Sequence, residues 1–184
     1  MTLLKVNNLS VSFKNRDGII HAVKDVSFNI DSGQILGIVG ESGSGKSVCC
    51  YSIMGLVENN KLSSKSGSIQ FEGNELLNAD EKYMRSIRGK KISMIFQDPM
   101  TALNPYLTIG QQIIEPLIIH HNIDKLEAKQ KALTLLEEVG ITDVESRYNQ
   151  SSSVLRWNAT KGCNCNGAYH RARIINCRRT NNGT

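Results

Sequence analysis

Residues 40–47 read Gly40-Glu41-Ser42-Gly43-Ser44-Gly45-Lys46-Ser47 and fit the pattern G-x-x-x-x-G-K-[ST], the phosphate-binding P-loop. The apolar residues 34–39 before this loop predict a buried parallel strand, and residues 48–56 after it predict a helix. The motif needs both of these neighbours for its mechanism, so a chance Gly/Ser turn is a poor explanation of the pattern.

The residue types in the loop are those that phosphate binding requires. Its glycines allow backbone conformations that are closed to residues with a Cβ atom. Successive N–H groups can then turn towards phosphate oxygens, and the positive end of the following helix adds to the attraction. Lys46 would reach the β- and γ-phosphates, and Ser47 would ligate Mg²⁺. We expect the nucleotide to contact Gly40, Glu41, Ser42, Gly43, Ser44, Gly45, Lys46 and Ser47.

The basic residues are concentrated at the C-terminal end. The chain of 184 residues has 22 Lys and Arg, six of them in residues 151–184, which contain no Asp or Glu. Residues 1–150 therefore keep 16 basic residues against 17 acidic ones, a net charge of −1, which gives no support to a nucleic-acid partner. The start lacks the apolar core of a signal peptide, and no apolar run approaches the about 20 residues that span a bilayer. We expect a cytosolic chain.

Hydrophobic patterning predicts the remaining elements. Strands are expected at residues 4–13, 23–30, 66–73 and 91–96, and helices at 79–89, 108–121 and 125–139. The last helix would bury its apolar residues mostly on one face. These residues are Leu126, Ala128, Ala132, Leu135, Leu136 and Val139. The adjacent His120 and His121 cannot share a helix face and are expected at the surface.

Three motifs carry a resemblance to a known family. They are residues 37–47 with the P-loop, residues 52–56 (Ser-Ile-Met-Gly-Leu), and residues 94–105 (Met-Ile-Phe-Gln-Asp-Pro-Met-Thr-Ala-Leu-Asn-Pro). Residues 1–150 resemble the ATP-binding subunit of an ABC importer, in the dipeptide, oligopeptide and nickel branch. The P-loop is generic to many NTPases, and the segment around Gln97 is much more specific.

The resemblance implies an α/β P-loop NTPase fold of the ABC ATPase type, with an antiparallel β-subdomain and, over residues 98–150, part of a helical subdomain. It implies ATP and Mg²⁺ as cofactors. Gln97 would contact Mg²⁺ and the attacking water, so that Lys46 and Gln97 would be catalytic and Ser47 and Gln97 would hold the metal. Phe13 would stack on adenine, although a core strand position explains this residue equally well.

The resemblance also implies partners. Two ATPase subunits would pair head to tail around two ATP molecules and would dock on transmembrane permease subunits at the inner face of the cell membrane. The peptide-type cargo would not touch this chain. Two alternatives are open: an ABC-type ATPase head of a non-transport protein, and a nucleotide-binding fragment without turnover.

The resemblance stops at Gln150. Residues 151–184 contain neither the Ser-Gly-Gly signature nor the acidic Walker B strand of the family. One synonymous coding of residues 150–184, read after skipping one nucleotide behind Gln150, restores both, with Phe-Ser-Gly-Gly followed by Leu-Leu-Ile-Ala-Asp-Glu. The choice of codons is partly free, but Trp157 followed by Asn158 forces the glycine codon GGA in the signature. We interpret residues 151–184 as an unstructured, out-of-frame tail.

The frameshift interpretation has two consequences. Cys163, Cys165, His170 and Cys177 need not form a metal site, and their spacing does not match a zinc motif. In the family fold, strands from beyond residue 150 flank the P-loop strand. With these core strands missing, we expect exposed apolar faces on the parallel sheet, an unstable chain, and no ATP hydrolysis.

Overall fold

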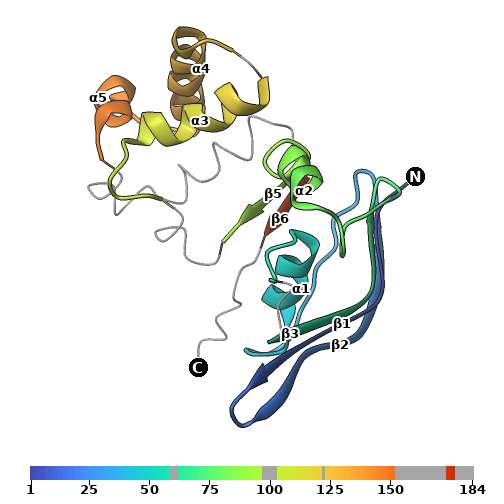
Figure 1. Ribbon diagram of the computed structural model, residues 1–184. Helices are drawn as coiled ribbons and strands as arrows, with labels where there is room; N and C mark the ends of the chain where they lie inside the picture. The colour runs from blue at the N-terminus through green and yellow to red at the C-terminus, as the bar shows by residue number, and fades with distance from the viewer. Residues whose placement is uncertain (59–61, 97–102, 122, 152–172, 177–184) are drawn as a thin grey trace. The chain divides into compact units, whose positions relative to one another are not determined.

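The computed structural model describes residues 1–58, 62–96, 103–121, 123–151 and 173–176. Two compact units divide the chain, Met1–Arg85 and Ser86–Thr184. Each unit is described by itself (Figure 1). No helix within the described part of the chain has the length and apolar character needed to cross a membrane.

An antiparallel sheet forms most of the first unit (Figure 1). Its strands are β1 (Thr2–Asn15), β2 (Gly18–Asp31), β3 (Ser63–Phe71) and β4 (Asn74–Glu75), in the order β2-β1-β3-β4. Each neighbouring pair is antiparallel. Leu4, Val6, Leu9 and Val11 of β1 are buried, as the near-alternating sequence predicts. The antiparallel β-subdomain is confirmed; the short strand β4 was not predicted.

The helix after the P-loop, α1 (Lys46–Ile53), packs on this sheet. Cys49, Cys50 and Ile53 are buried, and both cysteines are free thiols. Their small apolar side chains suit the interface between a helix and a sheet. In Figure 1 the helix lies against the inner face of the bent sheet.

The expected parallel strand at residues 34–39 does not form. These residues are not part of any sheet, and Ile35 and Val39 are 95% and 86% exposed. A central parallel strand needs neighbouring strands on its edges and cover on its faces. The described residues of the chain supply neither, so the apolar side chains of this segment are exposed.

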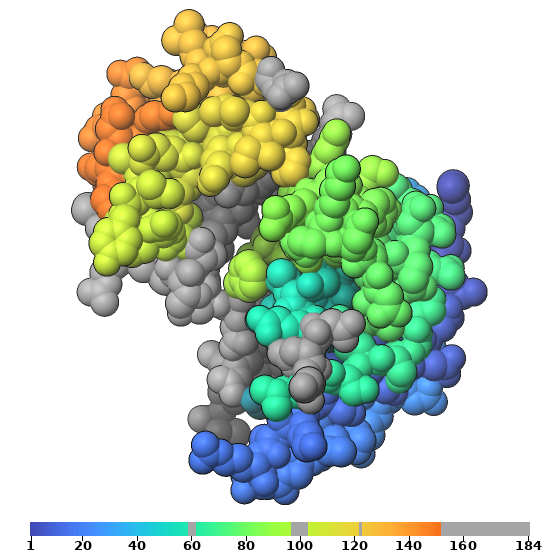
Figure 2. All heavy atoms as spheres, viewed as in Figure 1, coloured from blue at the N-terminus to red at the C-terminus, as the bar shows by residue number. Residues whose placement is uncertain are grey.

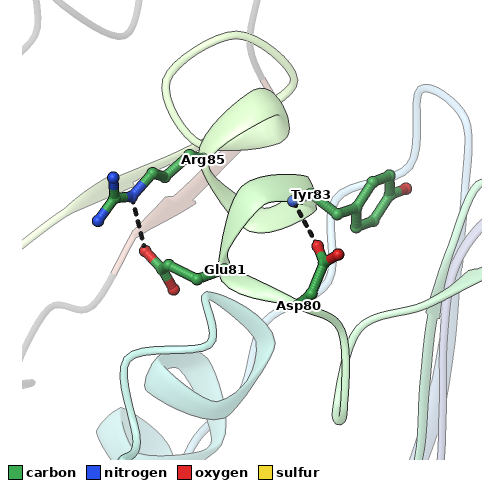
Figure 3. Close-up of polar contacts among 4 residues, drawn as sticks. All are labelled: Asp80, Glu81, Tyr83 and Arg85. Atoms are coloured by element: carbon green, nitrogen blue, oxygen red, sulfur yellow. Dashed lines mark hydrogen bonds and ion pairs between the residues drawn. The ribbon is translucent and has the colours of Figure 1, made fainter.

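Helix α2 (Glu81–Ile87) begins with a side-chain cap and an ion pair (Figure 3). The carboxylate of Asp80 accepts a hydrogen bond from the backbone N–H of Tyr83 at 2.6 Å, which satisfies one of the open donors of the first turn. The Arg85 guanidinium lies 3.2 Å from the Glu81 carboxylate, four residues earlier. Both side chains are exposed, so we assign the pair only a small stabilising effect.

The second unit contains a short parallel strand pair. Strand β5 (Ile92–Ile95) corresponds to the strand expected at residues 91–96, and it pairs with β6 (Arg173–Asn176). β6 lies in the segment for which we expected no regular structure. Parallel pairing needs only backbone groups in register, so even an out-of-frame segment can supply it.

Three helices form the rest of the second unit. They are α3 (Ile109–His121), α4 (Lys125–Glu138) and α5 (Val144–Asn149), and their atoms pack into one body, coloured yellow to orange in Figure 2. Asp124 caps α4 by accepting hydrogen bonds from two backbone N–H groups of its first turn. Four of the six apolar residues expected mostly on one face are buried, which confirms the expectation, and Leu126 is the exception at 72% exposed. It lies two residues before Ala128 and therefore points away from the buried stripe of Ala128 and Ala132. Helix α5 was not predicted.

The Tyr148 ring of α5 packs against Gly110 of α3 and connects the two helices. A Cβ atom on Gly110 would lie 2.3 Å from the Tyr148 ring, so only glycine lets the ring pack this closely. The ammonium of Lys129 lies 5.6 Å from the centre of the same ring. The N–H of Ile109 donates to the Gln150 carbonyl at 3.0 Å, and the Ser151 hydroxyl donates to the Pro105 carbonyl at 2.6 Å.

We predict that Gly110→Ala destabilises the three-helix body by about 1–3 kcal/mol, because the added methyl group overlaps the Tyr148 ring. Hydrogen exchange of the α3 and α5 amides in the full chain measures this loss. The cost should largely disappear in the Tyr148→Ala background, where the ring is absent. An equal cost in both backgrounds would contradict the packing role of Gly110.

Candidate phosphate-binding site

The backbone of residues 40–47 forms an open loop that leads into α1. Gly43 and Gly45 have φ angles of 82° and 83°, in the left-handed region that favours glycine. Gly45 is the N-cap of α1, and its carbonyl accepts from the Cys49 N–H at 2.9 Å. No side chain caps this helix end and its first turn has no acidic residue. The positive end of the helix is therefore directed into the loop without a competing carboxylate.

A close approach to β2 positions the loop. A Cβ atom on Gly45 would lie 2.0 Å from the carbonyl oxygen of Ala22 and 3.3 Å from the Val23 side chain. No other residue can occupy this position without moving the backbone of either the loop or the strand. The antiparallel sheet therefore determines where the N-terminus of α1 begins.

The Lys46 ammonium lies over the loop. Its Nζ atom donates to the carbonyl oxygens of Gly40 at 2.6 Å and Glu41 at 2.5 Å, and to the Ser44 hydroxyl at 3.0 Å. An ammonium has three donors, and all three are used within the loop. The same three donors become available to phosphate oxygens once the lysine exchanges its partners.

The other loop residues fit a phosphate cradle better than a complete metal site. Glu41, Ser42 and Ser44 are exposed, and Ser47 is half-buried at the second position of α1. Within the part of the chain that the structure describes, no group of three or more His, Cys, Asp or Glu could hold a metal ion. For a Mg²⁺ ion held by phosphate oxygens, the Ser47 hydroxyl is the side-chain ligand that this loop would offer.

Of the other predicted site residues, the structure describes Phe13 but not Gln97. Phe13 is half-buried in β1, paired with Ile20 of β2 and Ser63 of β3, so it lies near the Ala22 position that contacts the P-loop. Its role towards adenine stays a prediction. Gln97 lies outside the described residues. The sequence motif covered the loop itself, but the contact with Ala22 was missed because nothing in a strand sequence marks a carbonyl that a glycine approaches.

The two adjacent histidines of α3 differ in their surroundings. His121 is exposed, as expected. His120 is half-buried, and a Cβ atom on Gly89 would lie 3.2 Å from its ring nitrogen. Burial lowers the pKa of His120, and the positive charges of His121 and Lys90 lower it further. These residues form part of the second unit's packing, and we assign them no site.

Comparison with known proteins identifies the family. The family model described as "ABC transporter" matches residues 23–155. The chain therefore belongs to the ABC transporter family, as a P-loop ATP-binding domain, and the fold class expected from the sequence is confirmed.

Curated relatives match the same part of the chain. The oligopeptide transport ATP-binding protein OppD of Bacillus subtilis is 50% identical over 148 residues, which are 80% of this chain and 41% of that protein. The dipeptide transport ATP-binding protein DppD of Lactococcus lactis is 47% identical over 148 residues, 80% of this chain and 42% of that protein. The chain thus spans about two fifths of the length of the curated relatives it matches.

A solved structure supports the fold. The ATP-binding cassette MJ0796, in a dimeric post-hydrolysis state bound to ADP and Pi, superposes with a TM-score of 0.81. The match covers 95% of this chain and 73% of that one, at 24% identity. Identity at this level carries the fold alone.

We predict that Gly45→Ala detaches the start of α1 from β2, because the methyl group collides with the Ala22 carbonyl. The control is Gly33→Ala, since Gly33 has a φ angle of 81° but nothing within 4 Å of its added Cβ atom. The control variant therefore loses only the stability that corresponds to left-handed backbone strain, about 1–2 kcal/mol. Hydrogen exchange of the α1 amides should accelerate clearly more in Gly45→Ala, and equal acceleration in the two variants would refute the contact.

Proposed function

We propose that this chain is the nucleotide-binding part of an ATP-binding subunit that energises peptide import. The observation that carries the proposal is the preformed loop, with Lys46 bonded to three oxygen acceptors above the uncapped start of α1. The names of the OppD and DppD relatives support the peptide branch and the coupling to transport. The complete transporter would add transmembrane permease subunits and a second ATPase subunit, at the inner face of the cell membrane.

ATP is the ligand that the loop chemistry favours. Lys46 would hold the β- and γ-phosphates, and backbone N–H groups around Gly43 and Gly45 would bind their oxygens. Ser47 would contribute one Mg²⁺ ligand, and Gln97 would contact the metal and the attacking water. A bound Mg²⁺ supplies charge neutralisation for the phosphates. Phe13 would stack on the adenine ring.

This chain should bind ATP without hydrolysing it. Beyond Glu145 the sequence contains no Asp or Glu, so neither a Walker B carboxylate nor a following glutamate for the water is present in the 184 residues. Phosphoryl transfer depends almost entirely on positioned charges and a positioned nucleophile. The phosphate cradle alone supplies binding, and the two carboxylates needed for hydrolysis are not among these 184 residues.

We also propose that residues 151–184 are translated out of frame. The family match ends at residue 155, close to the point at which the sequence departs from the family pattern. In addition, β6 occupies residues 173–176, and the alternate frame encodes Glu-Leu-Leu-Ile of the apolar Walker B strand at these positions. In the chosen coding, the codons of Ile174 and Ile175 overlap two leucine codons of the alternate frame, so apolar residues occur in both frames. This overlap would explain why strand β6 forms in a tail of otherwise unrelated sequence.

We predict that Lys46→Ala weakens ATP binding at least about tenfold. The substitution removes hydrogen bonds to a charged group, which contribute about 1.5–3 kcal/mol. Lys5→Ala is the matched control, because Lys5 is an exposed lysine of β1 away from the loop. Titration with a fluorescent ATP analogue measures both variants. Phosphate release should remain at background for the parent chain; turnover that depends on Lys46 would contradict the proposed inactivity.

The reading frame gives a separate prediction. Sequencing the gene across codons 148–158 should reveal that one shift of frame restores the signature Ser-Gly-Gly. The simplest event is the loss of two nucleotides within a tyrosine codon directly after Gln150. If no single shift in this interval restores the signature, the frameshift proposal fails, whereas the proposal of ATP binding is unaffected.

A further inference from the structure

The side chain of Ser44 turns back across the P-loop, towards Gly40. A Cβ atom on Gly40 would lie 2.7 Å from the Ser44 hydroxyl oxygen and 3.5 Å from the Ser44 Cβ atom. Gly40 does not have the left-handed backbone of Gly43 and Gly45. The feature that a side chain at residue 40 would disturb is therefore the place of the Ser44 hydroxyl.

Ser44 is bonded within the loop through both its side chain and its backbone. Its hydroxyl accepts a hydrogen bond from the Lys46 ammonium at 3.0 Å. Its backbone N–H donates to the Glu41 carbonyl at 3.3 Å, which closes a turn over Ser42 and Gly43. The Glu41 carbonyl also accepts from Lys46, so Ser44 and Lys46 share an acceptor. The turn thus holds the Ser44 hydroxyl beside the ammonium.

The three acceptors of Lys46 differ in how easily they are released. An ammonium donates three hydrogen bonds, so an oxygen of a bound anion gains one only when an acceptor within the loop gives it up. Two of the acceptors are the backbone carbonyls of Gly40 and Glu41, which can leave only if the loop backbone moves. The third, the Ser44 hydroxyl, leaves by rotation about a single side-chain bond. Ser44 is therefore the acceptor that a ligand displaces most easily.

We propose that the Ser44 hydroxyl competes with phosphate oxygens for Lys46 and so lowers the affinity of the loop for a nucleoside triphosphate. The inference rests on the proposed function of the loop. Only the molecules in which the hydroxyl has left the ammonium can offer this donor to a ligand, and the apparent Kd rises as their fraction falls. Ser44 thereby sets the nucleotide concentration at which the loop fills.

The first test is the affinity of the full chain for a fluorescent ATP analogue. Ser44→Ala deletes the competing oxygen and should tighten binding about threefold to tenfold, the effect of one hydrogen bond at an exposed position. Ser44→Thr restores a hydroxyl and should return the affinity towards that of the parent chain. Ser32→Ala, at an exposed serine in the turn after β2, is the control and should leave the affinity unchanged.

A double substitution tests whether Ser44 acts through Lys46. In the Lys46→Ala background the hydrogen bond is already absent, so adding Ser44→Ala should change the affinity no further. Hydrogen exchange of the α1 amides should be the same in Ser44→Ala and the parent chain, because Ser44 is exposed. Unchanged or weaker nucleotide binding by Ser44→Ala overturns the proposal, as does an equal gain in the two backgrounds.

A second measurement needs no nucleotide. The Lys46 nitrogen must leave its acceptors before it can attack an acylating reagent, so its labelling rate reports how firmly the loop holds it. Lys5, an exposed lysine of β1, gives the reference rate in the same sample. Ser44→Ala should raise the ratio of Lys46 to Lys5 labelling at least about twofold, and Ser44→Thr should lower it again.

The two measurements separate a failure of this inference from a failure of the proposed function. An unchanged labelling ratio in Ser44→Ala overturns the role of Ser44 whatever the nucleotide affinity. If the ratio rises but neither the parent chain nor any variant binds the ATP analogue, the proposed function fails, and the hold of Ser44 on Lys46 is supported.

Discussion

The carbonyl oxygen of Ala22 lies where any side chain on Gly45 would have to be. This steric constraint connects the P-loop to the antiparallel sheet, and much of the first unit depends on it. With the loop held against β2, α1 can bury Cys49 and Cys50 on the sheet, and Lys46 can close over the loop carbonyls. The phosphate cradle therefore forms although the segment before it has no parallel partner among the residues that the structure describes.

The contrast between the two sides of the P-loop has one physical cause. The residues after the loop gain a buried interface from strands that are present in the same unit. The residues before it are apolar in both directions, and the described residues of the chain supply no neighbouring strand that would bury them. A strand is stable only through its neighbours, whereas a short helix can be stabilised by one face. The loop keeps its geometry, and the apolar segment stays exposed.

Much of this arrangement could be predicted from local patterns. The alternation of Leu4, Val6, Leu9 and Val11 predicted β1, and the P-loop motif predicted the loop and its helix. Residues 34–39 could not be predicted correctly from their own sequence, because their apolar character indicates burial but not whether a partner strand is available. Two other details could not be predicted. The exposure of Leu126 depends on the exact phase of the helix, and the approach of Gly45 to Ala22 is a contact of backbone atoms. The role of Gln97 depends on residues outside the described structure.

The hydrogen bond between the Ser151 hydroxyl and the Pro105 carbonyl affects how the chain unfolds and is degraded by proteases. It joins the two ends of the three-helix body across a separation of 46 residues, so that body is closed by its own contacts. Such a body can behave as an independent cooperative folding unit. During proteolytic turnover, Pro105 and Ser151 at the ends of this body would be protected as long as the bond between them and the helix packing hold.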